Sequence, residues 1–412
     1  MTASQTTGDG ISFEPSSEVR MIQSQIDEFI EKEIEPLEDE YDHFLGEEKE
    51  WTTVDEDGML VDEYLELRQE IREKSAEAGF YTMHMPERVG GGGLSALEYT
   101  MVLEHIHNRH PDGFHTMMLD GLSVTPSIIP MYEDDYLREH YFEPIMNAQK
   151  HMAFGLSEPE HGSDPHYMDT SAEKDGDEWV INGTKCHVSN SPNADFMLLF
   201  ARTSESDGDV TGISAFVIDR ENPGWELGKI QRPMGTDLGN HAFNHFNDCR
   251  VPESHLIGEE GKGFVTAMDW VGGGRLSVPA RAVGRSEWMF DQCVDYANGR
   301  KTFGEPIAQR QFVQDHLAKM RTRIEEVRWL YRYCAWKMDR DEEHRWLQSA
   351  AKWRGSELWC DVADMAIQLH GGAGYWRSLP FESEYRDARA TRIYEGTDEI
   401  QKRTIAKQFL DL

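Results

Sequence analysis

The chain has 412 residues, which is enough for two or three domains that each bury a core. Its 39% hydrophobic content is that of a globular protein, and no apolar run reaches the roughly 18 residues of a membrane-spanning helix. The net charge of −35 argues against nucleic acids and anionic membranes as partners, because both would be repelled.

The acidic residues are spread along the whole chain and are not gathered in a tail. This spread favours a solvated acidic surface suited to a salt-rich, halophilic cytoplasm over an acidic surface that serves a basic partner. The five cysteines are scattered and form no CxxC motif, which predicts reduced thiols and no metal site. Residues 1–14 are polar, lack an apolar segment and contain no arginine, so we expect neither secretion nor organelle import, and a cytoplasmic location.

Helical periodicity dominates the first third of the chain, after a segment, residues 1–18, that we expect to be disordered. Helical patterns cover residues 18–44, 60–78, 94–107 and 133–146, with a charged insertion at 47–56. The four glycines at 90–93 resemble a phosphate-binding loop, but no Lys-Ser or Lys-Thr pair follows them, so a turn is expected. We therefore predict an N-terminal α-helical domain over residues 19–150.

The pattern changes at about residue 151. Short segments separated by turn signals predict strands over residues 170–174, 178–182, 196–202, 212–219 and 241–249. They indicate an antiparallel middle β domain over residues 151–262. From residue 263 the pattern is helical again, with long amphipathic stretches at 315–340 and 353–370, which predicts a C-terminal helical bundle over 263–412. The fold class is α+β, with domains in the order α, β, α.

The most informative stretch lies near the C-terminus. Glu395 is a lone carboxylate followed by Gly396, which interrupts the helical backbone, and Thr397 is a good N-cap for the next helix. The donors of that helix point back towards the joint, where another molecule can approach the backbone closely. The alternative interpretation is a simple helix corner with a solvated glutamate.

Two segments of the β domain carry candidate binding groups. Residues 154–164 combine Ser157, Gly162 and Ser163 in a tight loop, a composition suited to holding a polar ring edge and a pyrophosphate. On the strand at 185–190, His187 and Ser189 are expected to project together. The alternatives are an ordinary polar loop and a structural, hydrogen-bonded histidine.

Two segments of the C-terminal domain complete the set. Arg300 and Lys301 stand beside Phe303, with Gln311 following, and this local basic pair in so acidic a chain suggests a phosphate ligand. The alternative is a pair of cations at a helix C-terminus. The turn at 368–374 has glycines that permit close approach, or it is an ordinary helix C-cap.

Taken together, five segments resemble the acyl-CoA dehydrogenase family over nearly the whole chain. They read FGLSEPEHGSDP at 154–165, INGTKCHVSN at 181–190, GRKTFGEP at 299–306, QLHGGAGY at 368–375 and IYEGTDEIQ at 393–401. The resemblance implies an α-helical N-terminal domain, a β-barrel-like middle domain and a C-terminal four-helix bundle. It also implies a homotetramer with one FAD per subunit.

The resemblance further implies a role for each matching residue. Ser157 would bond the pyrimidine edge of the flavin, and Ser189 would reach its N5. The residues that would hold FAD are Phe154, Leu156, Ser157, Gly162, Ser163, His187, Val188, Ser189, Arg300, Thr302, Phe303, Gln311, Gln368, Gly371, Gly372, Thr397 and Glu399. Among them, Arg300, Phe303, Gln311 and the turn at 368–372 would contact the FAD of a neighbouring subunit. Ser163, Arg275 and Gly396 would contact the substrate, and Glu395 would be the catalytic base.

The implied reaction is α,β-dehydrogenation of an acyl-CoA, as in fatty-acid β-oxidation, with electrons passed to an electron-transfer flavoprotein. The alternatives are an acyl-CoA oxidase that uses oxygen and a non-catalytic scaffold relative. Some relatives carry the base where this chain has Gly274, and many have a tryptophan where it has His187. Residues 272–274 lack an acidic residue often used for CoA, and residues 113–115 lack an arginine that would favour a dicarboxylate substrate.

Overall fold

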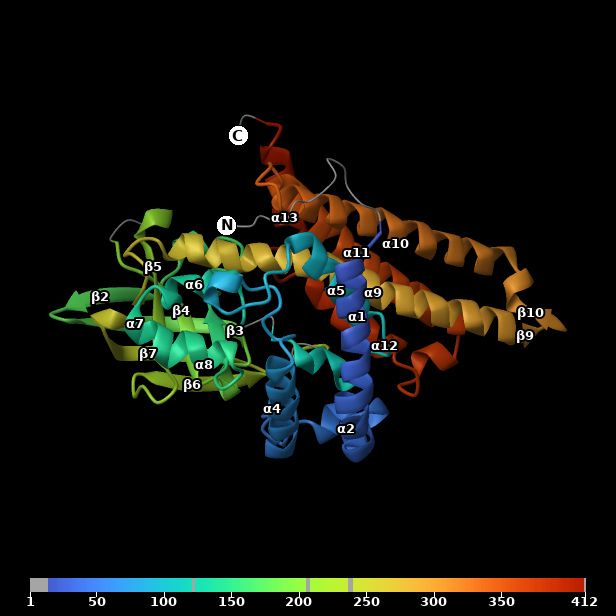
Figure 1. The fold of residues 1–412 in the computed structure, drawn as a ribbon, viewed down its shortest axis with the longest axis horizontal. Helices are drawn as coiled ribbons and strands as arrows, with labels where there is room; N and C mark the ends of the chain where they lie inside the picture. The colour runs from blue at the N-terminus through green and yellow to red at the C-terminus, as the bar shows by residue number, and fades with distance from the viewer. Residues whose placement is uncertain (1–13, 121–122, 205–207, 236–239, 411–412) are drawn as a thin grey trace.

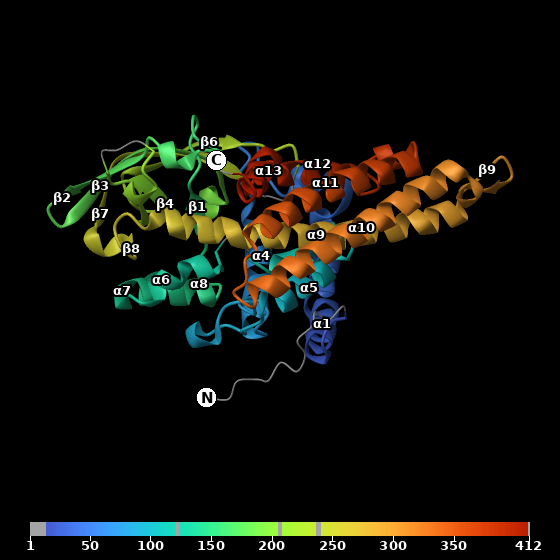
Figure 2. The same cartoon turned by 90° about the horizontal axis from the view of Figure 1, so that it is seen from above.

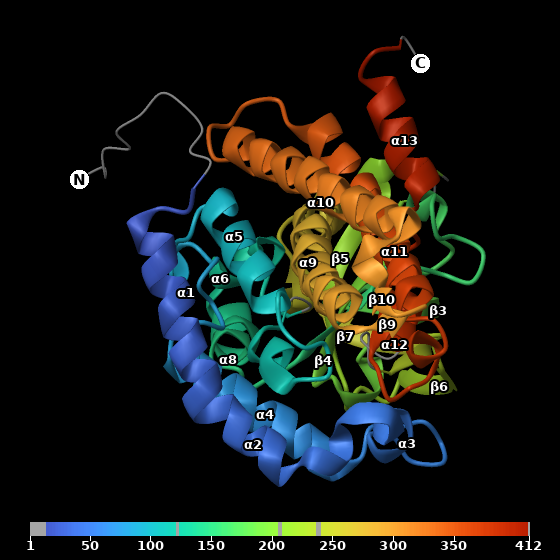
Figure 3. The same cartoon turned by 90° about the vertical axis from the view of Figure 1, so that its right-hand side faces the viewer.

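The computed structural model describes residues 14–120, 123–204, 208–235 and 240–410, so residues 1–13 of the segment predicted to be disordered lie outside it. Helix α1 begins at Ser17, two residues inside that segment, because the Ser16 side chain accepts a hydrogen bond from the Val19 amide and caps the first turn. The helices of the N-terminal domain are α1 Ser17–Phe29, α2 Glu35–Glu40, α3 Lys49–Thr52, α4 Asp62–Glu77, α5 Ala96–His107, α6 Ile129–Tyr132, α7 Asp135–Leu137 and α8 Glu143–Met146. A π-helical turn, Ile30–Ile34, joins α1 to α2, which form an outer edge of the molecule (Figure 3).

The middle domain is built on an eight-stranded sheet. Its strands run in the order β6-β7-β3-β2-β4-β5-β8, and β1 pairs with β4. The bounds are β1 Met152–Gly155, β2 Ser171–Asp175, β3 Glu178–Ser189, β4 Phe196–Arg202, β5 Ile213–Asp219, β6 Trp225–Gln231, β7 His241–Pro252 and β8 Leu256–Ile257. The sheet is mainly antiparallel, as predicted, and β4 departs from this pattern because it pairs in parallel with β1 and β2. The β2–β3 hairpin lies between β1 and β4 in the chain, and it supplies the long connection that this parallel pair requires.

The C-terminal domain is helical, as predicted. It comprises α9 Gly263–Gly299, α10 Gln311–Met338, α11 Arg345–His370, α12 Phe381–Thr391 and α13 Asp398–Lys407, with a small hairpin of β9 Lys301–Thr302 and β10 Glu305–Pro306 between α9 and α10. Helix α9 runs from the sheet to this hairpin, which forms the far tip of the molecule (Figure 1). The α, β, α order of the prediction is confirmed.

The hydrophobic cores join the three domains. Met131 and Tyr141 of the N-terminal domain pack in one core with Phe196 and Leu198 of β4, so α6–α8 cover one face of the sheet (Figure 2). Helix α5 also packs along α9, and a Cβ at Gly284 would lie 2.4 Å from the carbonyl oxygen of Glu104. Only glycine permits these two helices to approach so closely.

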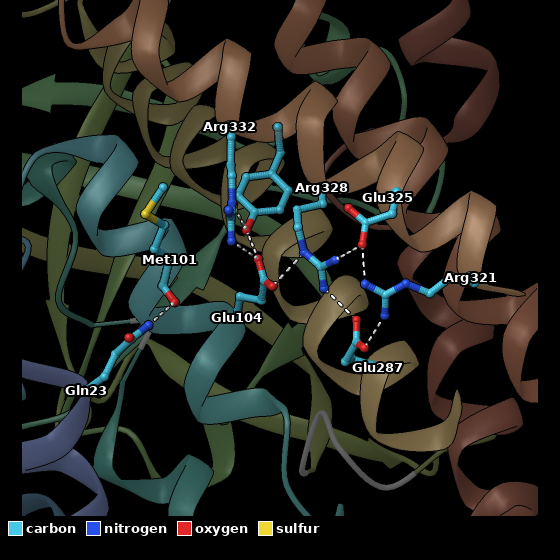
Figure 4. Close-up of polar contacts among 9 residues, drawn as sticks. Gln23, Met101, Glu104, Glu287, Arg321, Glu325, Arg328 and Arg332 are labelled. Atoms are coloured by element: carbon cyan, nitrogen blue, oxygen red, sulfur yellow. Dashed lines mark hydrogen bonds and ion pairs between the residues drawn. The ribbon is translucent and has the colours of Figure 1, made fainter. Parts of the chain in front are cut away.

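An ion-pair cluster fastens α5 to the bundle (Figure 4). Arg328 Nε lies 2.8 Å from Glu104 Oε1, and its Nη2 lies 2.6 Å from Glu287 of α9. Arg332 Nη2 lies 3.0 Å from Glu104 Oε2, and the buried Tyr331 hydroxyl donates to the same oxygen. Because these groups are shielded from water, removal of one partner would leave an unpaired charge, so the cluster fixes how the domains meet.

Candidate active site

The joint between α12 and α13 places Glu395 in an unusual backbone conformation. Glu395 has φ = 55° and Gly396 has φ = 84°, both in the left-handed region. A residue with a Cβ adopts this region only when its surroundings hold it there, at a cost of about 1–3 kcal/mol. The Thr397 hydroxyl accepts from the Ile400 amide at 3.3 Å and starts α13 immediately after the joint.

Side chains from three helices converge on the carbonyl oxygens of this joint. Arg275 Nε of α9 donates to the Glu395 carbonyl at 3.2 Å, and Gln401 Nε2 of α13 donates to the same oxygen at 2.8 Å. Lys352 Nζ of α11 donates to the Gly396 carbonyl at 2.7 Å. Lys352 and Gln401 are fully buried, so these bonds are shielded from water and hold the left-handed backbone in place.

The Glu395 carboxyl faces α9 at Gly274. A Cβ at that position would lie 2.4 Å from the carboxyl carbon, so the missing side chain provides the space that the carboxyl needs. Oε2 of Glu395 is buried and has no hydrogen-bond partner among the described residues. Burial raises the pKa of this carboxyl to about 8, although Arg275, Lys352 and Arg281 act to lower it. The carboxyl of Glu395 is therefore desolvated, unlike that of a solvated helix corner.

Sequence reasoning did not single out Lys352 or Gln401. Burial lowers the pKa of the Lys352 ammonium to about 8, against the opposing effects of Asp398 and Glu395. The available signal was its helical spacing, since Lys352 shares one face of α11 with Ser356 and Trp359, which are both buried. A lysine on such a face is rarely buried without a partner.

A second group of predicted residues lies on the β domain, where a buried ion pair anchors the loop at 156–163. Lys185 Nζ lies 2.7 Å from Glu158 Oε1 and donates to the Leu156 carbonyl at 3.2 Å. The Cys186 amide donates to the Ser157 carbonyl at 2.9 Å. The loop is thereby fixed to β3, although neither Lys185 nor Glu158 was among the predicted site residues.

Further along β3, a bulge between Lys185 and Val188 interrupts the strand register, and His187 has φ = 56°. His187 lies within this bulge and is exposed, Val188 is buried, and Ser189 is partly buried. Gln231 contacts His187 at two points. Its Oε1 accepts from the His187 amide at 2.9 Å, and its Nε2 lies 3.0 Å from His187 Nδ1. Ser189 Oγ lies 2.8 Å from His241 Nε2. This end of the β domain thus presents a hydrogen-bonded hydroxyl and an imidazole whose ring is held by Gln231 at the end of β6, the next strand but one in the sheet.

The third group of predicted residues is gathered at the far end of the C-terminal bundle (Figure 1). Arg300, Phe303 and Gln311 are exposed on or beside the β9–β10 hairpin, and the Phe303 side chain is 98% exposed. Arg310 donates to the Thr302 carbonyl at 3.0 Å and lies over the Phe303 ring. Gln368, Gly371 and Gly372 are exposed at the end of α11. Within one chain these residues are not brought together with Glu395.

The remaining predicted positions differ in how far they are buried. Phe154 is half-buried and stacks on Trp270 of α9 with ring centroids 3.9 Å apart, while Leu156 and Val188 are buried. Gly162, Ser163 and Glu399 are exposed. In the part of the chain that the structure describes, no group of three His, Cys, Asp or Glu residues is placed to hold a metal ion, and no helix is long and apolar enough to cross a membrane.

Comparison with known proteins now identifies the family. Three acyl-CoA dehydrogenase family models match consecutively, the N-terminal domain at residues 16–149, the middle domain at 153–249 and the C-terminal domain at 261–410. The chain belongs to the acyl-CoA dehydrogenase family. It is therefore an FAD-dependent oxidoreductase.

Relatives cover most of the chain. The short-chain specific acyl-CoA dehydrogenase of rat mitochondria is 36% identical over 337 residues, which are 82% of this chain and 81% of the relative. The 3-(aryl)acrylate reductase of Clostridium sporogenes is 34% identical over 384 residues, 93% of this chain and 96% of the relative. Among solved structures, butyryl-CoA dehydrogenase from Megasphaera elsdenii is 28% identical with a TM-score of 0.81, covering 97% of this chain and 99% of that one.

The donor set of the β domain fits a flavin. The hydroxyls of Ser157 and Ser189 suit the heteroatoms of the ring system, and the fixed loop at 156–163 supplies backbone groups of the kind that hold a pyrophosphate.

Proposed function

We propose that this enzyme catalyses α,β-dehydrogenation of an acyl-CoA thioester to the trans-2-enoyl-CoA, with Glu395 as the base. The observation that carries the proposal is the desolvated carboxyl of Glu395, which has an orphaned oxygen and a pKa raised to about 8. A base with a pKa near the working pH combines the correct ionisation state with a strong tendency to accept a proton. A family member without catalytic activity would have no need of this desolvated group.

The chain's own groups account for removal of the α-proton. The substrate carbonyl must be polarised while negative charge develops on it, and the Glu395 amide, which donates to no described residue, is suited to that task. Arg275 and Gln401 hold the carbonyl of the same residue, so they orient the amide and the carboxyl together. FAD, when bound, supplies the acceptor for the hydride that leaves the β-carbon.

We propose an electron-transfer flavoprotein as the redox partner. A chain in the structure reported as "Electron transferring flavoprotein of Acidaminococcus fermentans: Towards a mechanism of flavin-based electron bifurcation" is 32% identical, with a TM-score of 0.82 and coverage of 98% of this chain and 100% of that one. Subunit CarC of the caffeyl-CoA reductase-Etf complex of Acetobacterium woodii is 34% identical over 368 residues. Because relatives include both dehydrogenases and reductases, the reaction is best assayed in both directions.

The test is the Glu395→Gln variant, which keeps the volume of the side chain and removes its ability to accept a proton. The purified holoenzyme is mixed anaerobically with acyl-CoAs of increasing chain length, and bleaching of the flavin absorbance is followed. We expect bleaching in the wild type and a loss of rate of about 100- to 10,000-fold in the variant, with the FAD content unchanged. A variant that bleaches at nearly the wild-type rate would show that another group is the base.

The same experiments on the wild-type protein distinguish a dehydrogenase from a scaffold protein and from an oxidase. A wild-type protein that holds no flavin, or whose flavin no acyl-CoA bleaches, would favour the scaffold interpretation. Rapid reoxidation of the reduced enzyme by oxygen, faster than by an electron-transfer flavoprotein, would favour an oxidase. We further propose that the enzyme is a homotetramer in which Arg300, Thr302, Phe303, Gln311 and the turn at 368–372 complete the FAD site of a neighbouring subunit.

A further inference from the structure

A cleft of about 530 Å³ lies outside the site described so far, between α4 and the edge of the β domain. One wall is the face of α4 that carries Arg68 and Arg72, and the other includes His151, Asn190 and Asn193. Figure 1 shows α4 standing beside the sheet, between it and α2. None of the residues assigned to FAD, to the substrate or to catalysis lines this cleft. Its volume falls in the range typical of pockets for small ligands.

Arg68 is the cation of this cleft that no described residue pairs with. It is half-buried, and it has no hydrogen bond and no ion pair to any residue that the structure describes. The chain has 76 acidic and only 41 basic residues, so an arginine shielded from water without a carboxylate needs an explanation. Taking an unpaired guanidinium out of water is costly, and a bound anion would offset that cost.

The carboxylate behind Arg68 is already committed to other groups. Asp120 Oδ2 lies 3.3 Å from Arg72 Nη2 and 3.3 Å from His151 Nδ1, and it accepts from the Ser123 hydroxyl at 3.0 Å. Arg72 Nη1 also lies 3.0 Å from His151 Nδ1, whereas its buried Nε has no partner among the described residues. Asp120 therefore balances Arg72 and holds it in place, while the positive charge of Arg68 is left over.

The acidic residues at the rim are either engaged or open to solvent. Glu70 lies 3.3 Å from Lys74, and Glu73 accepts from Gln69 at 2.7 Å. Glu66 and Asp195, the remaining acidic residues of the cleft, are exposed, so water screens their charges. Asp195 Oδ2 also accepts from the His151 amide at 2.7 Å. None of these carboxylates is paired with the guanidinium of the cleft.

The guanidinium of Arg68 is charged at neutral pH. Burial and the neighbouring charge of Arg72 lower the pKa of this group to about 10, which is still well above 7. The α4 wall of the cleft thus presents an unbalanced cation one helical turn from a second guanidinium that has an unused donor.

We infer that this cleft binds a small phosphate monoester. The fork of Arg68 suits the oxygens of a phosphate, because guanidinium groups donate parallel hydrogen bonds to oxyanions, and the unused Nε of Arg72 is a further donor. The cleft is much larger than a phosphate ion alone, and the amides of Asn190 and Asn193 suit the hydroxyls of a polar ligand body. Asn190 directly follows Ser189, so an occupied cleft would adjoin the β3 end that we assign to the flavin.

The test compares Arg68→Gln with Arg88→Gln in the FAD-loaded enzyme. Arg88 is the matched control, because it is an exposed arginine of the same domain that lines no part of the cleft. Isothermal titration calorimetry is run with glucose 6-phosphate, inorganic phosphate and citrate, with KCl holding the ionic strength constant. Arg68→Lys, which keeps the charge and loses the fork, serves as a second variant if Arg68→Gln does not fold.

We expect the wild type and Arg88→Gln to bind glucose 6-phosphate more tightly than inorganic phosphate, and both more tightly than citrate. The dissociation constant should rise at least about tenfold in Arg68→Gln, and less in Arg68→Lys. Absence of phosphate binding by the wild type, equal binding by both glutamine variants, or a preference for citrate would each overturn the assignment. Tighter binding of inorganic phosphate than of glucose 6-phosphate would overturn the assignment of a phosphate ester as the ligand.

Discussion

Replacement of Gly274 by alanine is the sharpest test of the geometry around Glu395, because it adds one methyl group at the wall that the carboxyl faces. The new Cβ would lie 2.4 Å from the carboxyl carbon and 2.7 and 2.8 Å from its two oxygens. Ordinary contact between such atoms begins at about 3.5 Å, so the carboxyl must move by about 1 Å. The end of a glutamate side chain can make this shift, so the fold should survive.

The catalytic rate of Gly274→Ala should fall even though the fold survives. A displacement of about 1 Å at the reacting groups costs about 100-fold in rate, which corresponds to about 2.7 kcal/mol of activation free energy. We therefore expect kcat of Gly274→Ala to fall by about two orders of magnitude at unchanged FAD content. The assay is anaerobic turnover of an acyl-CoA with a dye as electron acceptor, alongside the flavin spectrum and the melting temperature.

Gly273→Ala is the matched control. It lies one residue away in the same helix, and a Cβ there would meet no atom within 4 Å. Both substitutions gain the same intrinsic helix propensity of alanine over glycine, about 0.5–1 kcal/mol, so stability is matched and only the contact with Glu395 differs. Equal kcat values for the two variants would refute the argument that the Gly274 notch positions the base.

The ionisation of Glu395 should govern how the enzyme responds to pH. Because burial raises the pKa of Glu395 to about 8 and only its carboxylate accepts a proton, kcat/KM should rise with pH and level off above about pH 8; a profile flat from pH 6 to 9 would contradict this assignment. The stability contributed by this group should be complete below its ordinary pKa of about 4.5 and be lost as the pH rises through about 8, which equilibrium unfolding across that range would measure. Arg300→Ala should loosen FAD and shift the tetramer towards smaller species, both reversed by excess FAD; light scattering that shows a fully flavinylated tetramer would leave Arg300 as a helix-end cation worth about 0.3–1 kcal/mol. Given the net charge of −35, molar KCl should raise the melting temperature, since the Debye length falls to about 3 Å at 1 M, and a melting temperature independent of KCl would exclude the halophilic interpretation.

The order of elements was accessible from the sequence because it depends on local patterns. Helical spacing located α4 and α5 to within two residues of their ends, and the Asp-Gly-Asp turn located the β2–β3 hairpin. The parallel pairing of β1 with β4 was missed, since no turn of this chain joins those strands directly. The predicted domain boundary at residue 150 also gave no sign of the core shared across it, because the burial of Met131 against β4 depends on tertiary packing.

The chemistry available at the joint could be read from the chain: a carboxylate, a glycine and a helix cap follow one another along residues 395–397. The surroundings of that carboxylate are determined by the tertiary structure. Arg275, Lys352 and Gln401 belong to three different helices, and the notch at Gly274 lies 121 positions before Glu395 in the chain. Local patterns record backbone preference and amphipathicity, whereas desolvation depends on every neighbour that excludes water. The raised pKa of Glu395 is therefore a property of the folded chain, which the residues of the joint alone do not specify.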